Sequence, residues 1–176
     1  VSQSIFVKCP VENQEDTFIV IWTTTPWTLP ANLAVAYNSQ FTYVRAKVEN
    51  KTYLLESTLL PKVAETCGWD SYETAGEIST AELAQMCYVH PFIDKTGPLL
   101  LGDTFVENST GSGFVHVAPG HGLEDYGLGS QNGLPIYSPV DDEGRLAHTN
   151  DLPAEAQMPE GLVGKSILEK KGNSEA

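Results

Sequence analysis

Short β-forming segments separated by turns restrict the fold of this chain more than any other feature. Residues 4–7 and 17–23 are rich in β-branched and aromatic types and predict strands. Residues 41–49 and 51–56 flank Asn50, which predicts a hairpin. Long helices do not alternate regularly with these strands, so a doubly wound parallel sheet is disfavoured. We therefore expect an α+β fold with a barrel-like mixed sheet and peripheral helices.

The remaining segments complete this expectation. Further strands or extended stretches are predicted at residues 33–36, 69–78, 99–106 and 113–117. Helices are predicted from a Ser57 cap to residue 66, from Ser79 onward, over 122–131 and over 161–171. Gly68 lies where a helix would end.

Length and composition indicate a single domain spanning residues 1–176, with a frayed tail at 172–176. The 41% hydrophobic content can supply a core, and no apolar run reaches the roughly 20 residues of a membrane helix. The chain begins at Val1 without a leader, so we expect a monomeric piece excised from a longer protein, with no membrane partner. Three cysteines without C-x-x-C spacing indicate a reducing, cytoplasmic compartment.

The net charge of −13 argues against nonspecific binding of nucleic acid. Such binding depends on Lys and Arg side chains that neutralise phosphates, and this chain has 10 of them against 23 acidic residues. Any RNA partner must therefore be held mainly by other parts of a parent protein, or touched only at one end.

The densest chemical signal is the run T-T-T-P-W-T-L-P-A-N at residues 23–32, directly after a predicted strand. Its two prolines stiffen the backbone, so four threonine hydroxyls and the Asn32 amide are held at fixed positions. Preorganised polar groups of this kind suit the binding of a polar ligand. The alternative is a capped turn whose hydroxyls bond only to local backbone.

A second signal is the run G-S-G-F-V-H-V-A-P-G-H-G-L-E-D-Y at residues 111–126. It places His116 on a strand and His121 between two glycines, where a backbone can approach a ligand closely. Glu124 and Asp125 follow in the first turn of a predicted helix, where acids are also favoured by the helix dipole alone.

Two look-alike patterns are set aside. The two histidines and two acids lack H-E-x-x-H spacing and any cysteine, so no metal site is expected. Residues 161–166 end like a phosphate-binding loop, but Pro159 stands where the pattern requires its first glycine. We expect Lys165 to be a solvent-facing helix residue.

Together, the two runs closely resemble the editing domain inserted in isoleucyl-tRNA synthetase, a class I aminoacyl-tRNA synthetase. The resemblance covers nearly the whole chain, including His90-Pro91-Phe92, Leu101-Gly102-Asp103 and Ser138-Pro139-Val140-Asp141. Related valyl and leucyl enzymes typically carry T-T-R-P, whereas Thr25-Pro26-Trp27 is the isoleucyl form. Val117 departs from the pattern, because many relatives have Thr there.

The resemblance implies roles for individual residues. Asp125 is expected to hold the substrate's ammonium group, and His116 to limit the size of its side chain. Thr25 is expected to act with these two in catalysis. The remaining residues expected to bind substrate are Thr23, Thr24, Thr28, Trp27, Asn32 and His121.

The implied activity is post-transfer editing, the hydrolysis of valine wrongly joined to isoleucine tRNA. Pre-transfer editing is left open. The expected partners are the 3′ terminal adenosine of a tRNA carrying valine and the rest of the parent synthetase. No cofactor is expected for this domain, since ATP, Mg and any Zn would serve only the parent ligase. Three alternatives stay open: a valyl or leucyl editing domain, a non-catalytic module that binds an aminoacyl group or RNA end, and an unrelated hydrolase with His116 as base.

Overall fold

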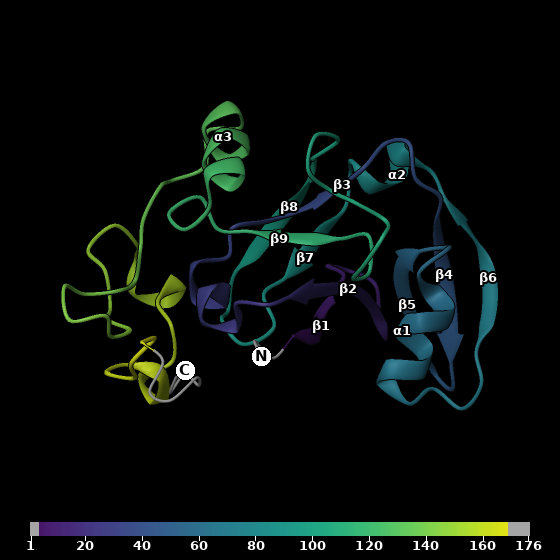
Figure 1. Ribbon diagram of the computed structural model, residues 1–176, viewed down its shortest axis with the longest axis horizontal. Helices are drawn as coiled ribbons and strands as arrows, with labels where there is room; N and C mark the ends of the chain where they lie inside the picture. The colour runs from purple at the N-terminus through teal and green to yellow at the C-terminus, as the bar shows by residue number, and fades with distance from the viewer. Residues whose placement is uncertain (1–3, 169–176) are drawn as a thin grey trace.

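The computed structural model describes residues 4–168, which form two mixed β-sheets with short helices around them (Figure 1). The first sheet has the order β1-β2-β5-β4-β6, in which β2 and β5 are parallel and the other neighbours antiparallel. Its strands are β1 Ile5–Pro10, β2 Thr17–Thr23, β4 Tyr43–Val48, β5 Lys51–Glu56 and β6 Glu73–Ile78. The predicted hairpin is thus confirmed as β4 and β5.

The second sheet has the order β7-β8-β3-β9 and is also mixed, because β3 and β8 run parallel. Its strands are β3 Ala34–Tyr37, β7 Cys87–Val89, β8 Thr96–Leu101 and β9 Val115–Val117. The α+β class is confirmed, but the barrel-like sheet is wrong, because the two sheets do not close on one another. The strand expected over 113–117 is shorter than predicted, since Gly113 has a positive φ of 81°.

The main core joins both sheets. Side chains from β2, β4 and β5 pack with others from β3, β7 and β8 in one buried cluster, which includes Ile19, Tyr43, Leu54, Tyr37, Tyr88 and Leu99. Burial of apolar side chains is the principal stabilising term in such a core. This shared core holds the two sheets together, and it places the end of β2 beside the second sheet.

Two helices differ in how they begin. Helix α1 (Leu60–Cys67) does not start with a Ser57 cap as expected, because the buried Glu56 carboxylate accepts the Leu59 amide instead (3.1 Å). Helix α2 (Thr80–Leu83) has the predicted cap, in which Ser79 Oγ accepts the Glu82 amide. Gly68 ends α1 in the left-handed conformation, as predicted.

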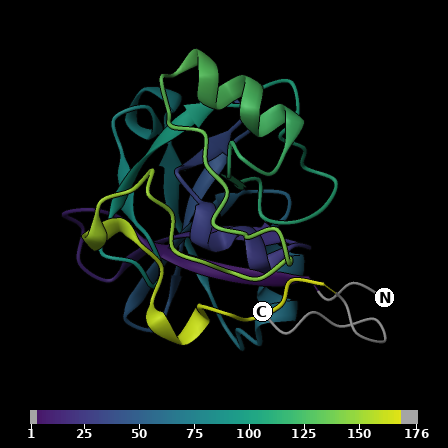
Figure 2. The same cartoon turned by 90° about the vertical axis from the view of Figure 1, so that its left-hand side faces the viewer.

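Helix α3 (Leu123–Gln131) matches the helix predicted over 122–131 and lies along the upper edge of the molecule in both views (Figures 1 and 2). The C-terminal segment below it carries only the short 3-10 turns η2 (Ala154–Ala156) and η3 (Glu160–Leu162) within the described residues.

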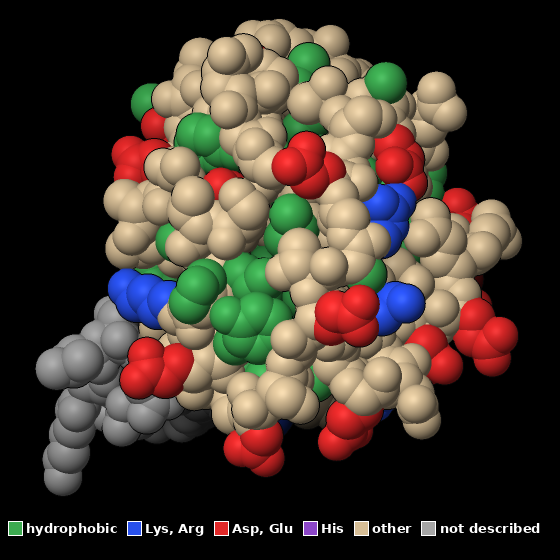
Figure 3. Space-filling view, turned by 90° about the vertical axis from the view of Figure 1, so that its right-hand side faces the viewer, with side chains coloured by type: hydrophobic (Ala, Val, Ile, Leu, Met, Phe, Trp, Pro, Cys, Tyr) green, Lys and Arg blue, Asp and Glu red, His purple; other side chains and the backbone are tan. Residues whose placement is uncertain are grey.

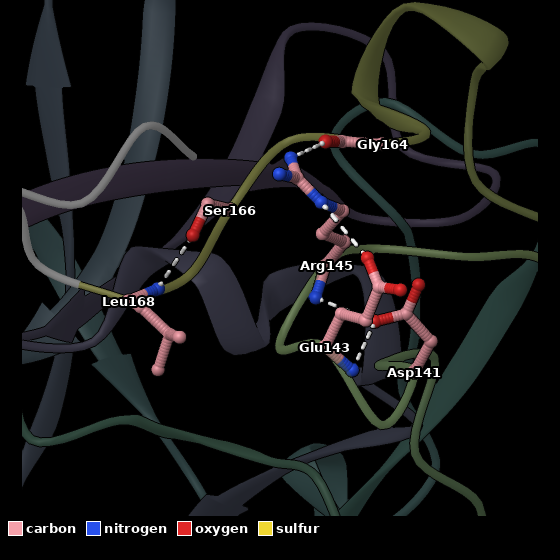
Figure 4. Close-up of polar contacts among 6 residues, drawn as sticks. All are labelled: Asp141, Glu143, Arg145, Gly164, Ser166 and Leu168. Atoms are coloured by element: carbon pink, nitrogen blue, oxygen red, sulfur yellow. Dashed lines mark hydrogen bonds and ion pairs between the residues drawn. The ribbon is translucent and has the colours of Figure 1, made fainter.

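The last predicted helix is wrong from residue 163 to 168, and residues 169–171 and the tail at 172–176 lie outside the described residues. The backbone of 164–167 pairs with 144–146 instead, and the Arg145 guanidinium donates to the Gly164 carbonyl (2.9 Å; Figure 4). Gly164 has a φ of +82°, which ends helical geometry there. Lys165 is exposed, as expected, but is not helical.

The acidic character is visible on the face formed by the first sheet and α1. Figure 3 shows several acidic and fewer basic side chains around an apolar patch on this face. Among residues 4–168, no helix has the length and apolar character needed to cross a membrane.

Candidate functional site

The threonine run leaves β2 and winds into a 3-10 helix, η1 (Pro26–Ala31). Thr23 is buried at the strand end, and its hydroxyl accepts the Thr25 amide (3.0 Å). Thr24 and Thr25 are exposed, and the Thr25 hydroxyl lies 3.4 Å from the Thr23 hydroxyl. Pro26 occupies the start of η1, where a missing N–H costs no internal hydrogen bond.

Asn32 ends η1 and lies deep in the protein, with 2% of its surface exposed. Its amide nitrogen donates to the Ala34 carbonyl (2.9 Å), and its amide oxygen accepts the Tyr88 hydroxyl. The structure therefore uses both ends of this amide to hold the end of the loop against β3 and β7.

The two sequence runs meet through Thr28 and His116. Residue His116 lies on β9, which pairs antiparallel with β3, and its Nε2 is 3.0 Å from Thr28 Oγ. The Thr28 hydroxyl has one proton, which it donates to the Thr25 carbonyl (2.8 Å). His116 Nε2 must then be the donor to Thr28, which leaves Nδ1 as a buried acceptor without a partner among the described residues. Burial, followed by the nearby His121, lowers the pKa of His116 to about 4, so the ring is neutral at pH 7.

His121 extends the contact between the two runs. Its ring meets Trp27 edge-on, with 5.1 Å between ring centroids. Burial lowers its pKa, and its Nε2 has no hydrogen-bond partner within residues 4–168. The turn that carries it is tight, because the His121 amide donates to the Ala118 carbonyl (2.9 Å).

Asp125 lies in the first turn of α3, and one of its carboxylate oxygens accepts the Ala118 amide (3.1 Å). Burial raises its pKa, the Ala118 amide lowers it, and the adjacent Glu124 raises it further. A half-buried carboxylate with its second oxygen available suits a cationic ligand, because a bound ammonium group favours its ionised form.

An apolar hollow of about 460 Å³ lies against Trp27, beside these polar groups. It is lined by η1, the turn after β7 and the C-terminal segment, through Pro26, Trp27, Pro30, Phe92, Leu146, Pro159, Gly161 and Leu162. Trp27 alone among the predicted site residues lines it. The polar site and the hollow therefore share one wall.

Contacts therefore join Thr28 to His116 and Trp27 to His121, while Thr23, Thr24 and Thr25 lie at the start of the same loop. The ligand-binding and catalytic roles assigned to these residues and to Asp125 stay predictions. The sequence did not single out Tyr88, and it gave His90 no role. Both point from β7 and its end toward η1, and their i, i+2 spacing on a strand is the signal that could have found them.

Within residues 4–168, no cluster of three histidine, cysteine or acidic side chains could hold a metal ion. The chemistry available here is that of hydroxyls, neutral imidazoles and one carboxylate.

No protein-family model matches the chain. Curated relatives do: an isoleucine–tRNA ligase of Syntrophomonas wolfei is 41% identical over 179 residues, covering 97% of this chain and 19% of that protein. The isoleucine–tRNA ligase of Fervidobacterium pennivorans is 46% identical, covering 98% of this chain and 18% of its own length. The chain is homologous to one segment of isoleucine–tRNA ligases. It spans about a fifth of the length of these curated relatives.

Solved structures show which fold the chain resembles. A crystal structure named GlLeuRS-CP1 matches with a TM-score of 0.63 and 14% identity, over 78% of this chain and 70% of that one. The editing domain of the cytosolic leucyl-tRNA synthetase of P. falciparum matches with a TM-score of 0.51 and 12% identity, over 64% and 45% of the two chains. At these identities the match concerns fold alone, and that fold is the one named CP1 or editing domain in leucyl-tRNA synthetases.

Proposed function

We propose that this segment hydrolyses valine wrongly attached to isoleucine tRNA. The observation that carries the proposal is the Thr28–His116 contact, because it joins the two runs of residues into one site. Homology to isoleucine–tRNA ligases over nearly the whole chain and the editing-domain fold support it.

The reaction needs little chemical machinery, because an aminoacyl ester is already activated. Water adds to the ester carbonyl, the bond to the tRNA hydroxyl breaks, and valine and free tRNA leave. Positioning the ester and water and stabilising the developing oxyanion lower the barrier. The exposed hydroxyls of Thr24 and Thr25 can orient the ester, while Asp125 binds the ammonium group and sets which end of the amino acid enters.

A second site is needed because one methylene changes binding by only about 1–3 kcal/mol, a range for which isoleucyl-tRNA synthetase is itself the standard example. A small pocket can instead exclude isoleucine by overpacking. His116 suits that wall, since it is 7% exposed and held in place by Thr28.

The charge of the domain agrees with contact to the RNA end alone. A chain of net charge −13 repels a long stretch of phosphates, whereas a single terminal nucleotide presents few of them. The apolar hollow beside Trp27 offers an aromatic wall on which the terminal adenine can stack. The remainder of a full-length synthetase would hold the body of the tRNA.

The test is Asp125→Ala in the full-length synthetase that contains this segment, assayed for deacylation of isoleucine tRNA charged with valine. We expect hydrolysis to fall to background while aminoacylation continues. Loss of the Ala118 hydrogen bond should cost about 1–3 kcal/mol of stability, too little to unfold the domain. Glu124→Ala is the matched control, because it removes an exposed acid from the same helix turn.

Retained deacylation in the Asp125→Ala protein would overturn the assignment. Deacylation rates on a panel of mischarged isoleucine, valine and leucine tRNAs identify which of them is the substrate. Binding of a valine–adenosine analogue by a wild-type protein without any turnover would favour the non-catalytic alternative.

A further inference from the structure

His90 follows β7 and is buried beneath η1, with 3% of its surface exposed. Its Nδ1 lies 3.3 Å from the Phe92 amide and 3.2 Å from the Ile93 amide. Its Nε2 lies 2.8 Å from the Leu29 carbonyl oxygen, 61 residues earlier in the chain. The His90 ring therefore joins the backbone of its own turn to the backbone of η1.

These contacts determine the protonation state of the ring. A carbonyl only accepts, so Nε2 carries the proton, and two amides only donate, so Nδ1 presents its lone pair. Burial lowers the pKa of His90 to about 4, in keeping with a neutral ring at pH 7. Both nitrogens are thus fully used by main-chain groups.

Two residues of the 3-10 helix cannot donate a main-chain hydrogen bond. Pro26 and Pro30 have no N–H, and the ends of η1 are held by Thr28 N–H to Thr25 O (3.1 Å) and Asn32 N–H to Leu29 O (3.0 Å). An external donor to the Leu29 carbonyl therefore restrains the middle of the loop. Trp27 and Thr28 directly precede Leu29, so a shift of Leu29 moves both.

We propose that His90 is a positioning residue for the editing reaction, holding η1 through the Leu29 carbonyl so that Thr28 meets His116 and Trp27 meets His121. The inference rests on the proposed function. His90 also stacks edge-on with Phe92 (4.6 Å between centroids), which lines the hollow that Trp27 shares. His90 thereby positions the polar site relative to the apolar hollow.

Two substitutions separate the two halves of the ring. In His90→Asn the amide oxygen can replace Nδ1 and keep the 90–93 turn, but no donor reaches Leu29. In His90→Gln the amide nitrogen can reach Leu29, but the acceptor for the turn is lost. His90→Asn forfeits one hydrogen bond to buried backbone and His90→Gln forfeits two, so His90→Gln should lose at least as much stability.

The experiment uses the full-length synthetase and valine-charged isoleucine tRNA. We expect His90→Gln to keep kcat for deacylation within about threefold, whereas His90→Asn lowers it about 10- to 100-fold, with KM and aminoacylation little changed. Native-state hydrogen exchange of the Asn32 amide, which donates to Leu29, should be faster in His90→Asn than in His90→Gln.

Losses of kcat that follow the melting temperatures of the two variants would show that His90 only stabilises the fold and would overturn the inference. Unchanged exchange at Asn32 in His90→Asn would overturn it too, even if that variant lost activity through unfolding. The wild-type rate tests the proposed function separately: absent hydrolysis there rejects the editing assignment, whereas wild-type hydrolysis with indistinguishable variants rejects the role of His90 alone.

Discussion

The two walls of the site are built differently. The wall formed by η1 is held from three sides, by Tyr88 on Asn32, His90 on Leu29 and His116 on Thr28. The wall at the start of α3 is open: Leu123 is 88% exposed, and Asp125 is tied to the second run through its hydrogen bond to Ala118.

The η1 wall is therefore rigid, whereas the α3 wall is accessible to a ligand. Buried hydrogen bonds fix η1, because a pocket that excludes a larger side chain must hold its width to within a fraction of an ångström. The open helix start leaves the carboxylate where a cation can reach it. We expect changes in the held wall to act through geometry and stability, and changes beside Asp125 in the open wall to act mainly on activity.

After Asp125→Ala, Gly122→Ala should have the largest effect on activity, because it displaces the Asp125 carboxylate in the open wall. A Cβ at this position would lie 2.9 Å from Asp125 Oδ2 and 3.0 Å from its Cγ, so the carboxylate must move. The φ of −132° at Gly122 accepts alanine without strain. Displacement of a catalytic group by about 1 Å can cost about 100-fold, so we expect deacylation by the full-length enzyme to fall about 10- to 100-fold.

Gly127→Ala is the matched control for this change. It lies in the same helix, and a Cβ added there would meet no atom within 4 Å among the described residues. Equal deacylation rates for the two alanine variants would contradict the idea that Gly122 leaves room for Asp125.

His116→Ala should have the next largest effect on activity. His116 contacts the held wall and is proposed to limit the size of the amino-acid side chain that enters the pocket. Removing the ring enlarges the pocket, so isoleucine tRNA carrying its correct amino acid should begin to be hydrolysed, by about tenfold above wild type. Deacylation of isoleucyl-tRNA and valyl-tRNA measured side by side checks this. Unchanged discrimination would remove His116 from the role of size limit.

Low pH should weaken the held wall. His90 has a folded-state pKa of about 4, below its ordinary 6.5, so as pH falls between these values the unfolded chain gains a proton that the folded chain does not. The contribution of His90 to the free energy of unfolding is complete above pH 6.5. It falls by about 1.4 kcal/mol per pH unit as the pH drops toward 4.

The measurement is urea unfolding of the chain at about pH 6.5 and about pH 5, within the window between the two pKa values, with His90→Asn beside the wild type. Asp125 acts in the opposite sense, because burial raises its pKa, so the difference between the two proteins is the quantity that reports His90. Parallel pH profiles of the free energy of unfolding would show that the fold does not lower the pKa of His90.

Gly127→Ala should have the smallest effect, and on stability only. Replacing an unstrained helical glycine by alanine restricts the unfolded chain, so the free energy of unfolding should rise by about 0.5–1 kcal/mol. Thermal unfolding of the chain measures it, and a loss of stability would show that the open wall is more tightly packed than the contacts around Gly127 indicate.

Local chemistry was sufficient to predict much of this protein. The hairpin of β4 and β5, the Ser79 cap and the helix from Leu123 follow from a turn residue, a capping serine and acids in a first helical turn. The threonine run was recognisable because prolines and hydroxyls are concentrated in it. Such signals depend on neighbours in the chain, and so they are readable without a fold.

Tertiary structure decided the rest, because the deciding contacts join residues far apart. Two open sheets replaced the expected barrel through strand pairing, and residues 164–167 paired with 144–146 instead of forming a helix. Asn32 stays a predicted pocket residue, and the hydrogen bond of its buried amide to Tyr88, 56 residues away, could not be read from the sequence. The sequence shows which polar groups this chain carries. Only the packing of β7 and β9 around η1 decided which of them bond within the protein and which are exposed, because those contacts join residues far apart in the chain.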